Sequence, residues 1–148
     1  MVIVRYWRKT APNAISNEEK VGLRAGLIKT VEEPVNPIAV QLAVTVAKAA
    51  RFDVPLDWPE LLPALSQAVQ SSDERIQHRG LLFLHHTIKA LASKRLAVDR
   101  RSFHDLSVQL VGYVLRLWDN FHQVVMQKLA DGGKEANIPL EKAVLTLK

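Results

Sequence analysis

Histidine is the residue type in this sequence that most directly suggests chemistry, because imidazole binds zinc and exchanges protons near neutral pH. Among the five histidines, His78 and His85 lie seven residues apart, and His86 follows directly. On a helix His78 and His85 would share one side but lie about 10 Å apart along the axis, too far to bind one zinc ion. Adjacent residues such as His85 and His86 diverge. The sequence also lacks cysteine and an HExxH motif, so we expect no metal site and no cofactor.

Catalytic motifs are absent as well. The sequence contains no GxSxG nucleophile elbow and no GxGxxG or phosphate-binding loop, and Gly132-Gly133 lies in a polar link rather than after a strand. The carboxylates of Asp53 and Asp57 flank a proline turn, where helix capping is their simplest role. We therefore predict that the chain is not an enzyme.

One cluster of basic residues is a candidate for nucleic-acid binding. Lys94, Arg95, Arg100 and Arg101 flank a predicted turn. Proteins that bind single strands combine such charge with exposed aromatic rings, whereas the one aromatic nearby, Phe103, belongs to an apolar helix face. We predict no specific nucleic-acid binding, although the formal net charge of +5 is compatible with an acidic protein partner.

Length and composition suit one domain or part of a larger repetitive one. The 148 residues are 48% hydrophobic, which is ample for a core, and the absence of cysteine excludes disulfides and fits a reducing compartment. The apolar run at the start of the sequence is too short for a signal peptide, and no later stretch is long enough to span a membrane. We expect a soluble intracellular chain.

Local signals predict six helices, preceded by residues 1–10 as the tail of an earlier helix. Ser16 and Glu19 form a capping box that opens the first helix, which should run to about Thr30. Asn36 as cap and Pro37 as first residue open the second helix, to about Arg51.

The third helix is predicted to open at Asp57, with Glu60 completing a second capping box, and to run to about Gln70. Trp58 lies beside several leucines, where its indole would be wedged between helices, and Trp7 and Trp118 have the same interpretation. Pro63 removes an amide that should already be bonded, so we predict a bent or 3₁₀-like first turn.

Three further helices complete the pattern. Ser71-Ser72-Asp73 caps the fourth, which runs to about Ser93, and Asp99 caps an unusually long fifth that continues towards Leu129. Asp131-Gly132-Gly133 is a stop signal, and residues 139–148 begin the sixth helix.

The spacing of the predicted caps indicates a repeat architecture. Ser16, Asp57 and Asp99 are separated by about 41 and 42 residues, within the period of HEAT and armadillo arrays. We predict an all-α fold, a right-handed α-solenoid of about three HEAT-type helical hairpins truncated at both ends, because a closed bundle has no reason to repeat. The predicted boundaries are 1–15 for the preceding tail and linker, 16–52 and 57–95 for two complete pairs, and 99–148 for an incomplete third, all within one segment, 1–148.

Motifs along nearly the whole chain carry a family resemblance. They are Tyr6-Trp7-Arg8, Glu18-Glu19-Lys20, Leu23-Arg24, Leu27-Ile28, Pro34, Ile38, Gln41-Leu42-Ala43, Ala47, Asp53, Pro55, Trp58-Pro59-Glu60-Leu61-Leu62-Pro63, His78-Arg79-Gly80-Leu81-Leu82 and the run from Lys89 to Ala97. Together they resemble the N-terminal region of the importin-β (karyopherin) superfamily. Members of this family also have further N-terminal helices and many more repeats.

The resemblance implies a function in nuclear transport. The family consists of HEAT-repeat superhelices that carry cargo between cytoplasm and nucleus, so it implies a nuclear import receptor fragment found in both compartments. It also implies that second helices line a concave surface that binds the GTPase Ran in its GTP form. First helices would line the convex surface, where phenylalanine-glycine repeats of nucleoporins dock. The sequence does not identify the cargo protein.

Two helix faces are the candidates for Ran binding, and we call their polar residues the basic strip. An electropositive strip suits an acidic protein surface, although an ordinary solvated face remains the alternative. The basic strip consists of Gln41, Thr45, Lys48 and Arg51 on the second helix and Arg75, His78, Arg79, His86 and Lys89 on the fourth.

The sequence does not assign the residues of a nucleoporin-binding groove. A nucleoporin groove would lie between residues 16–30 and 58–70, but periodicity does not assign Leu23, Leu27, Leu61, Leu65 and Val69 to groove or core.

The alternative function is a generic helical-repeat scaffold that binds a peptide or acidic protein outside nuclear transport. Exposed solenoid ends tend to be sticky, so we also expect concentration-dependent self-association, which light scattering would detect.

Overall fold

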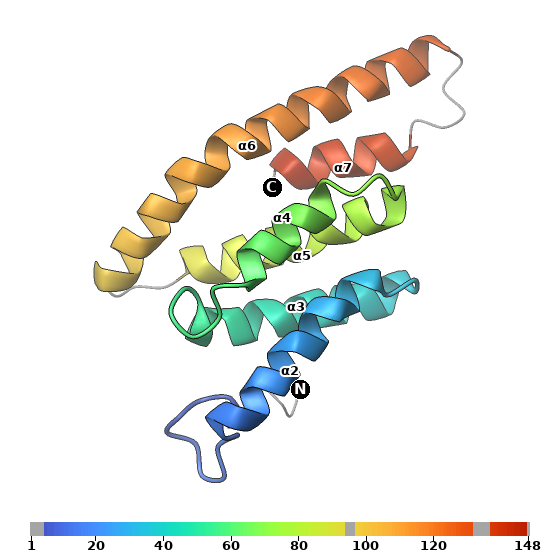
Figure 1. Ribbon diagram of the computed structural model, residues 1–148. Helices are drawn as coiled ribbons and strands as arrows, with labels where there is room; N and C mark the ends of the chain where they lie inside the picture. The colour runs from blue at the N-terminus through green and yellow to red at the C-terminus, as the bar shows by residue number, and fades with distance from the viewer. Residues whose placement is uncertain (1–4, 94–96, 132–136, 148) are drawn as a thin grey trace. The chain divides into compact units, whose positions relative to one another are not determined.

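The computed structural model describes residues 5–93, 97–131 and 137–147, and within these ranges all regular structure is helical. The chain divides into two compact units, Met1–Lys94 and Arg95–Lys148, which are treated separately below. The first unit contains α2 (Asn17–Lys29), a 3₁₀ turn η1 (Thr30–Glu32), α3 (Asn36–Asp53), α4 (Leu61–Val69) and α5 (Glu74–Ala92). The second contains α6 (Ala97–Ala130) and α7 (Asn137–Leu147). The helices follow one another as hairpins (Figure 1).

Helix α2 begins where the sequence predicts. Ser16 is its N-cap, and both halves of the capping box are present: Glu19 N donates to Ser16 Oγ over 3.2 Å, and Ser16 N donates to Glu19 Oε2 over 2.9 Å. The helix ends at Lys29 and tightens into η1, one turn before Pro34. The first predicted helix is confirmed.

The buried side of helix α3 is made of small apolar residues. Ala39, Ala43, Val46 and Ala50 have no exposed surface, so α5 lies close against α3. The predicted cap is wrong by one residue: Val35 is the N-cap and makes no side-chain bond, while Asn36 is the first helical residue. The side chain of Asn36 accepts a hydrogen bond from α5 instead, as described below.

Helix α4 starts later than predicted, at Leu61, and Asp57 does not cap it. Asp57 N and Trp58 N both donate to the main-chain oxygen of Asp53, at 2.7 and 3.1 Å, which keeps them in the preceding turn. The late start also changes the position of Pro63 in the helix. Pro63 is the third residue of α4, where amides have no intrahelical partner, and the helix is closed by Ala64 N bonding to Glu60 O at 3.1 Å.

Helices α4 and α5 form an antiparallel pair with a close crossing at Gly80. A Cβ built on Gly80 would lie 2.8 Å from Val69 N and 2.9 Å from the carbonyl carbon of Ala68, so only glycine fits there. Asp73 caps α5 as predicted, accepting from Arg75 N and Ile76 N.

In the second unit the long helix α6 packs on α7, and the buried apolar residues of the two helices include Leu117, Phe121, Val125 and Ala143. The prediction that Asp99 is an N-cap is wrong, because α6 begins at Ala97 and Asp99 lies in its first turn. Gly132-Gly133 of the predicted stop signal lies outside the described residues. Of the three caps whose spacing indicates the repeat, only Ser16 therefore opens a helix as predicted.

Candidate protein-binding site

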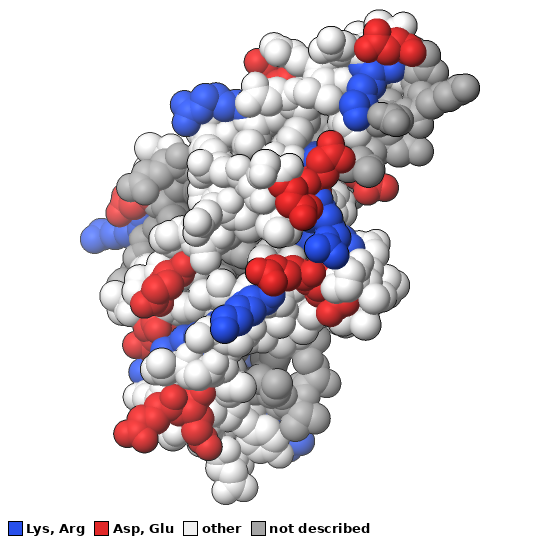
Figure 2. Space-filling model, turned by 45° about the vertical axis from the view of Figure 1, so that its right-hand side comes forward, with Lys and Arg blue, Asp and Glu red and all other residues white. Residues whose placement is uncertain are grey.

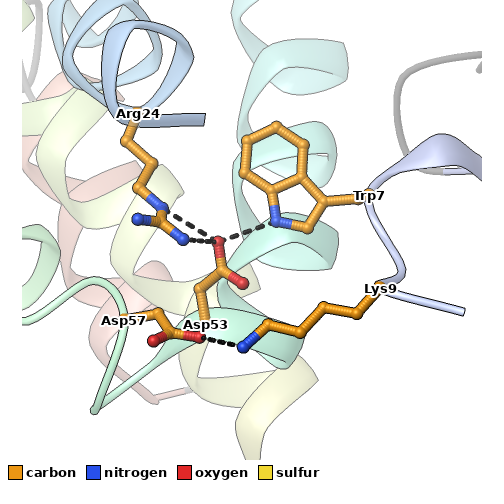
Figure 3. Close-up of polar contacts among 5 residues, drawn as sticks. All are labelled: Trp7, Lys9, Arg24, Asp53 and Asp57. Atoms are coloured by element: carbon orange, nitrogen blue, oxygen red, sulfur yellow. Dashed lines mark hydrogen bonds and ion pairs between the residues drawn. The ribbon is translucent and has the colours of Figure 1, made fainter. Parts of the chain in front are cut away.

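A buried carboxylate fixes the N-terminal segment and α2 against the end of α3 (Figure 3). One oxygen of Asp53 accepts from Trp7 Nε1 at 2.7 Å and from Arg24 Nε and Nη2 at 2.9 and 2.8 Å. The Asp53 side chain is 4% exposed, so these charge-assisted bonds replace its lost hydration. Asp57 instead forms a more exposed ion pair with Lys9, at 3.3 Å. Both carboxylates thus have structural partners.

The α3 part of the basic strip is divided between exposed and structural residues. Gln41 and Lys48 are exposed, and half-buried Thr45 donates its hydroxyl to the carbonyl of Gln41 at 2.8 Å. Arg51 reaches across to the end of α5, where it donates to Ala90 O at 3.1 Å, to Ser93 O at 3.3 Å and to the Ser93 hydroxyl. A cation at this position satisfies carbonyls that lack helical partners and suits the negative end of the helix dipole.

Arg79 does not lie on the accessible surface of the basic strip, where the sequence predicts it. Its side chain is buried, with 7% of the residue exposed. The guanidinium donates to Glu33 O at 3.1 Å, Pro34 O at 3.2 Å and Asn36 Oδ1 at 2.6 Å. The fork of arginine donors thus joins α5 to the turn before α3 and to the first residue of α3.

The rest of the α5 part is accessible. Arg75 and Lys89 are exposed, and His78 and His86 are half-buried. A ring nitrogen of His78 lies 3.3 Å from Arg79 Nη1. Burial, followed by the neighbouring charge of Lys89, lowers the pKa of His86 below its usual value of 6.5, so His86 is neutral at physiological pH.

His85 was missed by the sequence reasoning, although a signal for it existed. It is half-buried, and its ring meets that of His86 edge to face at a centroid distance of 5.2 Å. It lies seven residues after His78 and four before Lys89, a spacing that places all three on one side of α5. His85 therefore lies among the residues of the basic strip.

The surface of α3 and α5 is poor in acids. Across both helices the acidic residues are Asp53, which is buried and paired, and Glu74, the first residue of α5. Figure 2 shows another pattern, because acidic and basic side chains are interspersed on the face that it draws. The exposed cations of α3 and α5 thus have little acidic competition along their own helices.

The residues considered for a nucleoporin groove separate into two groups. Leu61, Leu65 and Val69 are at most 1% exposed and belong to the core, whereas Leu23 and Leu27 on α2 are half-buried. The prediction that tryptophans fill the core is confirmed for Trp7 and Trp58, each 1% exposed. Trp118 is half-buried and stacks on the ring of His122.

Other kinds of site find little support within the described ranges. No group of three or more histidine or acidic residues in this part of the chain is arranged to hold a metal ion. Of the cluster considered for nucleic acid, Lys94 and Arg95 lie outside the described residues, as does the side chain of Arg100, and Arg101 is exposed. Among the helices that the structure describes, none is long and apolar enough to cross a membrane.

Known proteins resemble the chain along almost its whole length. Human Importin-11 is 47% identical over 147 residues, which is 99% of this chain and 15% of Importin-11, and mouse Importin-11 matches to the same extent. The chain belongs to the importin-β superfamily. The importin beta-like protein kap113 of Schizosaccharomyces pombe is 33% identical over 109 residues, 71% of the chain and 11% of kap113. No family model matches the chain.

The solved structure of Lph2, described as a bidirectional nuclear transport receptor in S. cerevisiae, has the same fold. It superposes with a TM-score of 0.76 and 24% identity over 98% of this importin-β-like chain and 14% of Lph2. The predicted all-α solenoid is confirmed by this likeness and by the helical order. The chain spans 15% of the length of the Importin-11 sequences it matches.

Proposed function

We propose that the chain is part of a nuclear import receptor and that its α3–α5 face binds Ran in the GTP form. The α3–α5 face is the accessible part of the basic strip: Gln41, Thr45, Lys48, Arg75, His78, His86 and Lys89. In this proposal it takes part in carrying a protein cargo through the nuclear pore, where nucleoporin phenylalanine-glycine repeats bind the receptor, and it shuttles between cytoplasm and nucleus. The similarity to Importin-11 and the shared fold with Lph2 support the transport role.

The observation that carries the Ran proposal is the set of exposed cations on two packed helices that have almost no acid of their own. Lys48, Arg75 and Lys89 are exposed, and Glu74 is the one exposed acid among the residues of α3 and α5. Such a surface favours an acidic partner mainly through the rate of association. The same face also contains Gln41, Thr45, His78 and His86. Arg51 and Arg79 have a structural role instead, because their hydrogen bonds join neighbouring elements.

Binding to Ran loaded with GTP or with GDP tests the proposal. We expect the 148-residue chain to bind the GTP form preferentially, with an association rate that falls as salt concentration rises. A triple variant with Lys48→Glu, Arg75→Glu and Lys89→Glu should lose most of this binding. A matched control with Arg5→Glu, Lys29→Glu and Arg116→Glu makes the same change in net charge at exposed residues that do not belong to the basic strip and should retain it.

The same experiment separates the alternative function. Equal binding to both nucleotide forms, or equal loss in the two triple variants, would contradict a Ran site on this face. Capture that depends on the basic strip but not on the nucleotide would instead support a scaffold for acidic proteins outside nuclear transport.

A further inference from the structure

Three histidines interrupt the cations on the accessible side of α5. His78, His85 and His86 are all half-buried and lie between exposed Arg75 and exposed Lys89. His85 and His86 are four and three residues before Lys89, the spacings at which helical side chains are neighbours. His78 lies 3.3 Å from the guanidinium of Arg79, the charge of Lys89 acts on His86, and the rings of His85 and His86 are in contact.

The elements packed against α5 carry charged groups of both signs, the basic ones on α3 and acidic ones at η1. Helix α3 contributes Lys48 and Arg51, and its one carboxylate, Asp53, is bound to Trp7 and Arg24. Helix α4 has no ionisable side chain, although Glu60 precedes it. The acids near η1 are Glu32 and Glu33, and a side-chain oxygen of Glu33 accepts from Val35 N at 2.9 Å. Within α5 itself the only acid is Glu74, in the first turn, and the exposed N-cap Asp73 precedes it.

We infer that His78, His85 and His86 make the α3–α5 face a proton-linked binding surface, which takes up protons when an acidic protein surface docks on it. The inference rests on the proposed function for the identity of the partner, Ran in the GTP form. Binding would consequently tighten as the pH falls through the range in which these imidazoles gain their protons.

The direction follows from the charges around the rings. In the free chain burial and Lys89 lower the pKa of His86, so its imidazole is uncharged near neutral pH. Carboxylates of a docked partner favour the imidazolium and raise that pKa, so the complex binds more protons than the free proteins. Linkage then requires the affinity to increase as protons are added. If docking raises the pKa of one histidine by one unit, the affinity at acid pH exceeds the affinity at alkaline pH by up to about tenfold.

Affinity measured at two pH values tests the inference. The dissociation constant of the 148-residue chain for Ran carrying a non-hydrolysable GTP analogue is compared at about pH 7.5 and about pH 5.5, on either side of the histidine range. The variants are His86→Gln and the pair His85→Gln with His86→Gln. His104→Gln, an exposed histidine on α6, is the matched control. Because groups on Ran also titrate, the informative quantity is the difference in pH dependence between the chain and each variant.

We expect the gain in affinity on acidification to be about threefold to tenfold larger for the unmodified chain and His104→Gln than for His86→Gln, and smallest for the double variant. Calorimetry in two buffers of different ionisation enthalpy should show fewer protons taken up on binding by His86→Gln. Thermal unfolding at about pH 7.5 shows whether each variant is folded. Equal pH dependence and proton uptake in all proteins, with GTP-dependent binding intact, would overturn the proton linkage alone. Absence of GTP-dependent binding at both pH values would overturn the proposed function and this inference with it.

Discussion

Arg24 places two nitrogens, Nε and Nη2, within 2.9 Å of the same carboxylate oxygen of Asp53, although the two residues belong to different helices. Trp7 Nε1 bonds to that oxygen as well, at 2.7 Å. The main-chain oxygen of Asp53 receives the amides of Asp57 and Trp58. One residue therefore joins the N-terminal segment, α2, the end of α3 and the loop that leads into α4.

Asp53→Asn should destabilise the first unit strongly. The substitution leaves the guanidinium of Arg24, whose side chain is 13% exposed, without its counter-charge. Breaking a buried ion pair by removing one partner typically costs about 3–5 kcal/mol. Asp57→Asn is the control, because the Lys9–Asp57 pair is exposed, and such pairs contribute about 0–1 kcal/mol. Chemical denaturation followed by circular dichroism measures both, and equal effects would contradict the structural role assigned to Asp53.

Arg79→Met should destabilise the contact between α5 and the start of α3. The unbranched apolar side chain of methionine fills part of the same space but removes the donors to the oxygens of Glu33 and Pro34. We expect a loss of about 2 kcal/mol, the order of magnitude for stranding buried polar groups. Arg79→Lys should recover only part of it, because lysine lacks the planar fork. Arg75→Met, at an exposed neighbour, should change the free energy of unfolding little, and a similar loss in both would refute the assignment.

Ser16→Ala should destabilise α2 by about 1 kcal/mol through loss of the N-cap. The same capping box has a pH dependence. Hydrogen bonds from Ser16, the backbone one first, lower the pKa of Glu19 from 4.5. The stabilisation that Glu19 provides is therefore present above that value and is lost as the pH falls through the lower pKa of the folded state. Glu19→Gln should weaken this acid-induced loss in thermal unfolding, while Glu18→Gln, outside the hydrogen bonds of the box, should leave it.

Two glycine substitutions should change the free energy of unfolding in opposite directions. Gly80→Ala places a methyl group 2.8 Å from a backbone atom of α4, so α4 and α5 must separate, at a cost of about 1–3 kcal/mol. Gly26→Ala, in the exposed middle of α2, meets nothing within 4 Å and should stabilise the chain by about 0.5–1 kcal/mol. The thermal unfolding midpoints of the two single variants test both predictions. An unchanged midpoint for Gly80→Ala would contradict the close crossing, because it would show that α4 and α5 can separate without cost.

Local signals predict the helices well where nothing distant competes with them. The Ser16–Glu19 box and the Asp73 cap are formed entirely by neighbouring residues, and both are present. Asp57 carries an equally good capping signal, but the carbonyl of Asp53 binds its amide and that of Trp58, so the chain stays in a turn. Asp99 fails because α6 starts before it.

The candidate site illustrates the same limit. Periodicity correctly places Lys48, Arg75 and Lys89 on exposed surface, because a helix face is a local property. It cannot distinguish them from Arg79, which donates to three oxygens that lie 43 to 46 residues earlier in the chain. Whether a cation faces water or satisfies buried oxygens depends on tertiary contacts that no helical pattern contains.

The two structural arginines have a mechanical consequence. Arg79 joins the first turns of α5 to the start of α3, and Arg51 joins the end of α3 to the last turn of α5. The two helices are therefore parallel and fastened at both ends, so neither sliding nor splaying is easy between them. The backbone positions of Lys48, Arg75 and Lys89 are consequently preorganised before any partner arrives. Less conformational entropy is then lost on association. If the chain bends, the bending occurs outside the α3–α5 pair.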